Sequence, residues 1–323
     1  MIIAFHFMSS IVKQGGSWSE YWIVAPMGSI GVSFFIIISG AGIYIGSLNW
    51  SGATNFYRKR IKNIYPTFWF VYLFMTCFLF VFANRVYVGP DPVKWIITIL
   101  GFDGYMSWYT STYYIIGEWF LGFIIIIYAL FPLVKVMLDK SKAITLILSV
   151  IVSVLIYMNN KVISNAIPIF NASPEWNPLV RLPEFIFGAI IASLIMNKSK
   201  IIAYLTPVAL VYIIISLSTF DNLDKGFFSI PSLCSLFVLI TVSINKLGVK
   251  ENIRFIVYFF SANSFVAFLV HHKVIGVLGM YVKVNPVNAP AVYIYMISVM
   301  LIVFTIAYFL SIPLKNINKI FAK

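Results

Sequence analysis

Charged side chains are scarce in this sequence. Only 10% of its 323 residues are charged, whereas 61% are hydrophobic. Soluble domains carry about 25% charged residues, so the composition excludes a water-soluble enzyme and a disordered chain. The two cysteines, Cys77 and Cys234, lie within apolar runs without metal-binding or redox spacing, which excludes a secreted disulfide scaffold. The sequence therefore predicts a polytopic membrane protein.

Apolar segments long enough to cross a bilayer recur along the chain. A transmembrane helix needs about 20 mostly apolar residues. Nine segments reach or approach that length, at residues 28–48, 64–83, 113–136, 142–158, 181–196, 201–219, 227–245, 255–280 and 291–314. Residues 1–12 form a shorter segment, so we expect either that residues precede Met1 or that this helix is a half-span. The prediction is an all-α bundle of about ten transmembrane helices, in one integral-membrane domain over residues 1–323.

Basic residues are unevenly distributed between the predicted loops. If the loop at 49–63 is cytoplasmic and the side alternates at each span, cytoplasmic segments hold 15 of the 23 basic residues and only two acidic ones. The remaining eight basic and eight acidic residues lie elsewhere, and their charges cancel. The net charge of +13 therefore lies entirely on the predicted cytoplasmic side. Lys and Arg accumulate in cytoplasmic loops. We therefore expect a multi-pass protein of the cell membrane with a cytoplasmic C-terminus, and no nucleic-acid partner.

Two ionisable residues lie within or beside predicted apolar helices. His6 stands in a strongly apolar run, where its imidazole is either a general base or a hydrogen-bonded interhelical contact. Glu118 begins another apolar helix and is either a proton acceptor, a ligand of a substrate hydroxyl, or half of an interhelical pair. Both residues are candidate catalytic groups.

A dense basic cluster precedes the second long span. Arg58, Lys59, Arg60 and Lys62 are flanked by aromatic residues. The cluster is either a topology anchor beside anionic lipid or a binding site for a multiply charged phosphate ligand. Coenzyme A carries a pyrophosphate and a ribose phosphate, which would match the cluster from the cytoplasmic side.

Three further patterns favour structural roles. Arg181 and Glu184 have the spacing of a local i,i+3 ion pair. His271 and His272 are adjacent, so their side chains point about 100° apart on a helix. Because no third ligand is nearby in the sequence, we expect no metal site, and we expect one of the two side chains to face a cavity. The span at 28–48 contains the small residues Gly31, Gly40, Gly42 and Gly46, of which the last two form a Gly-x-x-x-Gly motif. Such residues predict close packing between helices.

The ordered set of short motifs resembles the membrane acyltransferase-3 family, whose members O-acylate cell-surface glycans and related acceptors. The matching segments are FHF at 5–7, GVSFFIIISG at 31–40, FYRKRIKNIYP at 56–66, EWFLG at 118–122, YALFP at 128–132, RLPEFIFG at 181–188 and FLVH at 268–271. Many members carry Asp where Ser33 stands, which suggests a polysaccharide O-acetyltransferase-like subfamily or an altered substrate.

The resemblance implies roles for the candidate residues. His6 matches the family's proposed active histidine, and Arg58, Lys59 and Arg60 match its basic cluster for cytoplasmic acyl-CoA. The expected function is therefore transfer of an acyl group, acetyl in the first instance, from acyl-CoA to a hydroxyl of a cell-surface or lipid-linked glycan, with Glu118 orienting His6 or the acceptor. Membrane lipid is the other expected partner, and no permanently bound cofactor is expected.

Two other classes of function remain open at this point. A polytopic transporter or flippase for a polyprenyl-linked or anionic substrate would also be apolar, although we find no convincing pair of broken helices in corresponding halves of the chain. A membrane glycan polymerase, or a catalytically inactive relative, is the other alternative. No Gly-x-x-x-x-Gly-Lys motif is present, so nucleotide hydrolysis is unsupported.

Overall fold

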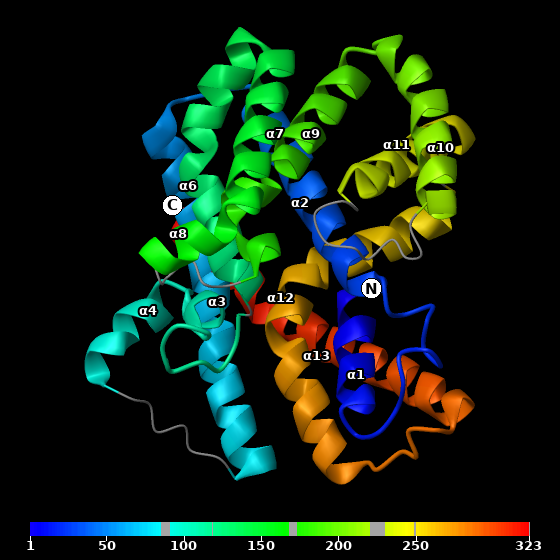
Figure 1. The fold of residues 1–323 in the computed structure, drawn as a ribbon. Coiled ribbons are helices and arrows are strands. Elements are labelled where there is room, and N and C mark those ends of the chain that lie inside the picture. The colour runs from blue at the N-terminus through cyan, green and yellow to red at the C-terminus, as the bar shows by residue number, and fades with distance from the viewer. Residues whose placement is uncertain (85–90, 118, 168–172, 220–229, 249, 323) are drawn as a thin grey trace. The chain divides into compact units, whose positions relative to one another are not determined.

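The computed structural model describes residues 1–84, 91–117, 119–167, 173–219, 230–248 and 250–322. Within these ranges the regular structure is helical and no β-strand occurs. The α-helices are α1 (Ile2–Val12), α2 (Met27–Gly46), α3 (Ala53–Ala83), α4 (Trp95–Ile99), α5 (Asp103–Met106), α6 (Trp119–Lys140), α7 (Lys142–Met158), α8 (Asn160–Ala166), α9 (Pro178–Met196), α10 (Ile201–Thr219), α11 (Ile230–Leu247), α12 (Glu251–Tyr281) and α13 (Ala289–Ala322). The all-α prediction is confirmed (Figure 1).

Several of these helices can cross a membrane. Six described helices are long and apolar enough, namely α2, α3, α6, α9, α12 and α13. A seventh span results if α7 and α8, which meet at a 71° bend, count together. The chain is thus a multi-pass membrane protein, but the predicted count of about ten is not confirmed. One reason is α1, whose 11 residues cover only about 17 Å of a hydrocarbon core about 30 Å thick.

The start of α3 differs from the sequence-based expectation. A loop was expected over residues 49–63, yet the helix begins at Ala53 and continues for 31 residues. Gly52 has a φ of +98°, a left-handed conformation that ends the preceding turn at little cost for glycine. No glycine or proline follows until Pro66. The prediction of a loop is therefore wrong after residue 52, and the basic cluster lies on a helix.

The described residues divide into two compact units. The first unit comprises Met1–Ala25, Thr54–Gly122 and Glu251–Lys323, and the second comprises Pro26–Ala53 and Phe123–Lys250. Each unit therefore assembles segments that are distant in the sequence. The single domain over residues 1–323 stays a prediction.

In the second unit, α2 packs closely against α9 through two glycines. A Cβ atom built on Gly40 would lie 1.9 Å from the carbonyl oxygen of Phe185, and one on Gly188 would lie 1.9 Å from that of Ile37. Only glycine permits such an approach of two helix backbones. Small residues allow this packing in membranes, where no hydrophobic effect drives helices together.

The prediction of close helix packing is thus confirmed for Gly40. It is wrong for the Gly-x-x-x-Gly motif formed by Gly42 and Gly46. A Cβ on Gly42 or Gly46 would meet nothing within 4 Å. The contact between α2 and α9 follows a stripe through Gly40, and Gly42 lies about 200° away from Gly40 around the helix. Sequence spacing alone cannot tell which glycine faces a neighbour.

In the first unit, α1 packs against α12 and α13, which lie side by side (Figure 1). The buried residues of α1 are mostly large, and they include Ile3, Phe7 and Met8. Phe7 meets Tyr295 of α13 edge to face, with ring centroids 5.2 Å apart. The segment after α1 is tied to the same unit, because the Tyr21 hydroxyl donates a hydrogen bond to the Pro286 carbonyl. This packing fixes the position of His6 on α1.

Candidate functional site

Three histidines meet in the first unit. The His6 ring of α1 lies 4.2 Å from the His272 ring and 5.3 Å from the His271 ring, measured between centroids. The two α12 rings are 4.9 Å apart. One ligand nitrogen from each of the three side chains lies within 4.8 Å of the others. The chain has only three histidines, so all of its imidazoles gather at this point.

The His271 ring has a defined tautomer. Its Nδ1 atom lies 2.7 Å from the carbonyl oxygen of Phe268, one turn earlier in α12. A carbonyl oxygen can only accept a hydrogen bond, so Nδ1 carries the hydrogen, and in the neutral ring Nε2 carries the lone pair. His271 is fully buried, whereas His6 and His272 retain exposed surface. The cluster thus has a fixed interior ring and two rings that a substrate could reach.

This geometry corrects one premise of the sequence analysis. The expectation that no third ligand lies near the His271–His272 pair was wrong, because His6 lies against both rings. Adjacent residues on a helix do diverge, but a side chain from a second helix bridges the gap between them. No sequence pattern joins residue 6 to residues 271 and 272, so only the packing of α1 on α12 could reveal the cluster.

The other predicted catalytic residue, Glu118, lies outside the described residues, and its role stays a prediction. The residue before it, Gly117, has a φ of +80°. A Cβ there would lie 3.2 Å from the Phe68 ring of α3 and 2.9 Å from a methyl group of Leu121. Glycine is therefore required at the entry to α6.

The basic cluster lies on the first turns of α3. Successive helix residues point about 100° apart, so Arg58, Lys59 and Lys62 share one side and Arg60 points away from it. Arg58 and Lys59 are exposed. Arg60 is half-buried, with its guanidinium carbon 5.6 Å from the centre of the Phe56 ring. Arg58 and Lys59 therefore present exposed charges on one side of the helix, whereas Lys62 on that side and Arg60 on the other are each half-buried.

A buried ion pair occupies the second unit. Arg181 Nε donates to Glu184 Oε2 at 2.7 Å, and Nη2 donates to Oε1 at 3.0 Å. The predicted i,i+3 pair is confirmed. Ser33 of α2 completes it, since its hydroxyl donates to Glu184 Oε1 at 2.6 Å and accepts from Arg181 Nη2 at 2.7 Å. Sequence reasoning missed this role of Ser33.

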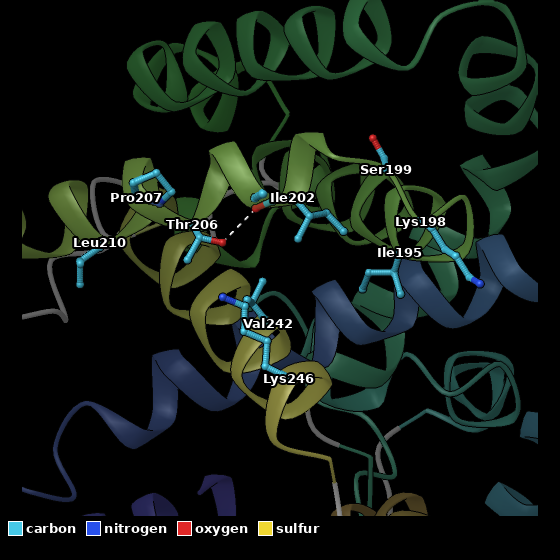
Figure 2. Close-up of a pocket in the computed structure, with 10 residues that line it drawn as sticks. Ile195, Lys198, Ser199, Ile202, Thr206, Pro207, Leu210, Val242 and Lys246 are labelled. Carbon is cyan, nitrogen blue, oxygen red and sulfur yellow. Dashed lines mark hydrogen bonds between the residues drawn. The ribbon is translucent and has the colours of Figure 1, made fainter.

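The second unit also contains an open groove of about 720 Å³ between α10 and neighbouring helices (Figure 2). Its walls are mostly aliphatic, and they include Ile195, Leu210 and Val242. Lys198 and Lys246 are the charged residues of the lining. Of the described residues predicted to be catalytic or to bind acyl-CoA, none lines this groove.

The chain matches a known protein family along almost its whole length. A sequence profile described as an acyltransferase domain, the acyltransferase-3 family, matches residues 1–310. The chain belongs to this family. A search of curated proteins found no significant match, and neither did a search of solved structures.

Membership of the acyltransferase-3 family makes the chain a membrane acyltransferase and gives the histidine cluster its chemical context. Acyl transfer needs a group that accepts a proton from the acceptor, and a neutral imidazole can do so near neutral pH. The cluster in the first unit brings three imidazoles together, of which those of His6 and His272 retain exposed surface. The Arg181–Glu184 pair, by contrast, is buried and hydrogen-bonded to Ser33, as a packing element of α2 and α9 would be.

Proposed function

We propose that this acyltransferase moves a short acyl group, such as acetyl, from cytoplasmic acyl-CoA to a hydroxyl of a cell-surface or lipid-linked glycan. The observation that supports this best is the position of His6, which lies in a cluster of imidazoles within a chain of the acyltransferase-3 family. In this proposal the protein is located in the cell membrane, and its C-terminus is cytoplasmic.

The chemistry requires one base. The lone pair of the His6 imidazole accepts the proton of the acceptor hydroxyl while the hydroxyl oxygen attacks the thioester carbonyl. The carbon–sulfur bond then breaks, and the imidazolium returns the proton to the coenzyme A thiolate. A variant of this route passes the acyl group briefly through the His6 nitrogen. Glu118 orients His6 or the acceptor in either case.

The donor binds through its phosphates. Arg58 and Lys59 present exposed cations on one side of α3, with Lys62 beside them, and Arg60 adds charge from its position over Phe56. Hydrogen bonds to charged groups are worth about 1.5–3 kcal/mol each. The same first unit contains the histidines, so a donor held on α3 and the proposed base belong to one compact body.

The test uses purified protein in detergent, with acetyl-CoA and a glycan acceptor, and measures acceptor-dependent release of coenzyme A thiol. General-base assistance contributes about 10²–10⁴-fold, so His6→Gln should lose activity on that scale. Ser9→Ala, also on α1, is the matched control and should retain activity. Mass spectrometry of surface glycans should show one acyl group fewer in cells with the His6 variant. Unchanged transfer by His6→Gln would overturn the assignment.

A second arm of the same assay tests the donor. The double variant Arg58→Gln/Lys59→Gln should raise KM for acetyl-CoA at least about tenfold, since even one charged hydrogen bond is worth that much. It should leave KM unchanged for acetyl-pantetheine, which lacks the nucleotide phosphates. Lys140→Gln, at the end of α6, is the control. An equal effect on both donors would refute phosphate binding by the cluster. Transport of a substrate without any acyl product would instead favour a flippase.

A further inference from the structure

We propose that His6, His271 and His272 form a binding site for a divalent transition metal ion, and that Zn²⁺ is the ion it takes. The ligand nitrogens, one from each ring, lie within 4.8 Å of one another. They come from two helices that pack against each other, so the site belongs to the folded protein and would not exist in the unfolded chain.

The His271 ring is already arranged as a metal ligand. Histidines that bind metals commonly donate the hydrogen of their second nitrogen to a backbone carbonyl or carboxylate, which fixes the ring and leaves the other lone pair for the metal. His271 does this through Nδ1 and the Phe268 carbonyl at 2.7 Å. Its Nε2 atom therefore has the lone pair that coordination requires, and the buried ring cannot easily turn away.

The remaining geometry needs only a small adjustment. Zinc binds imidazole nitrogen at about 2.0–2.1 Å, so two nitrogens in a tetrahedral site lie about 3.3 Å apart. The ligand nitrogens now lie within 4.8 Å of one another, so each nitrogen–nitrogen distance must shorten by at most about 1.5 Å. His6 and His272 retain exposed surface, so rotation of these two side chains can supply it without moving a packed ring.

The ligand set selects the type of metal. Imidazole suits zinc, copper and nickel, whereas magnesium and calcium prefer oxygen ligands. Three histidines provide three of the four positions of a tetrahedral zinc centre and leave one position for water or another small ligand. Because neutral imidazoles bring no negative charge, the bound ion keeps its double positive charge and favours an anion at that position.

Metal binding has a consequence for catalysis, and this part of the inference rests on the proposed function. A neutral imidazole has a single lone pair, so His6 cannot coordinate a metal and accept the acceptor's proton at the same time. Bound zinc therefore removes the proposed base. We infer that zinc inhibits acyl transfer and that a chelator restores it.

The direct test measures metal content and does not depend on activity. The full chain is purified in detergent with an affinity tag that lacks histidine, stripped with a chelator, and dialysed against Zn²⁺ or Co²⁺. We expect one metal ion per chain by elemental analysis, and a visible absorption band from bound Co²⁺ that imidazole ligands produce. Loss of an outer-shell partner alone weakens metal binding about 10–100-fold, so His272→Gln, which removes a ligand, should weaken it more. Ser264→Ala, also on α12, should bind normally.

The outcomes separate the two proposals. Zinc binding no stronger in the native chain than in His272→Gln would overturn the metal site, whatever happens to activity. Because His272 retains exposed surface, this variant should fold even if substitution of buried His271 does not. Binding with inhibition by zinc, and no inhibition by magnesium, supports the whole inference. If chelation abolished activity and zinc restored it, the metal site would be supported. The inhibition by zinc and the role of His6 as a metal-free base would both be overturned.

Discussion

Removing one partner of the buried Arg181–Glu184 pair should destabilise the protein more than removing both. Glu184 has no exposed surface and Arg181 is 6% exposed. Breaking a buried pair by truncating one partner typically costs about 3–5 kcal/mol, whereas replacing both with apolar residues of similar size is often neutral or stabilising. We therefore expect large losses for Arg181→Met and Glu184→Met, and a small change for the double variant.

The two single variants should also differ from each other. A carboxyl group left alone can take up a proton and become neutral, but a guanidinium group cannot lose its charge in a protein. Glu184→Met, which strands Arg181, should therefore be the more damaging change. Ser33→Ala removes one hydrogen bond from each partner and should cost about 1–3 kcal/mol.

The free energy of unfolding can be measured by titrating the protein in mild detergent with a denaturing detergent and following tryptophan fluorescence. The chain offers a matched control in the Lys135–Asp139 pair of α6, whose carboxylate is 58% exposed. Asp139→Ala should cost only about 0.3–0.5 kcal/mol, as for other exposed helix pairs. A double variant at 181 and 184 whose loss equals the sum of the two single losses would refute the coupling between these residues.

Two further predictions concern other contacts. Gly188→Ala should destabilise the second unit by about 3 kcal/mol or more, because its Cβ would lie 1.9 Å from the Ile37 carbonyl oxygen; Gly42→Ala, with open space around it, is the control for thermal unfolding. Burial raises the pKa of Asp103, which accepts a hydrogen bond from Thr98 at 2.8 Å, above its ordinary 3.8. The folded state then holds this proton more tightly than the unfolded state, so stability should fall as pH rises from about 4 through the raised pKa. Asp103→Asn should abolish that slope in unfolding measured against pH, and an unchanged slope would contradict it.

The class of fold follows from the sequence because its cause is compositional. A chain with so few charges can bury its apolar surface only in a bilayer, and backbone hydrogen bonding within the bilayer requires helices or closed barrels. The start of α3 was not predictable in the same way. Aromatic and basic residues suit an interfacial loop as well as a helix, and the helix prevails because nothing after Gly52 interrupts it before Pro66.

The candidate site was predicted only in part, for a physical reason. His6 stands out because an ionisable group in an apolar helix is costly. Its partners on α12 could not be inferred, since a contact between distant helices leaves no local periodicity. The same holds for Ser33, a small polar residue that looks like packing until Arg181 and Glu184 are seen to share its hydroxyl.

The contact between Gly40 and Gly188 has a consequence for how the protein can move. At each glycine, the hydrogen that replaces a Cβ points at a carbonyl oxygen of the other helix, the arrangement of a weak Cα–H···O hydrogen bond. The two contacts are reciprocal, and a shift of α2 along α9 by a single residue would replace both hydrogens with side chains. The Ser33–Arg181–Glu184 cluster fixes the same register one to two turns away. We therefore expect α2 and α9 to move as one rigid body during the catalytic cycle, so that any opening that admits substrates occurs between other helices.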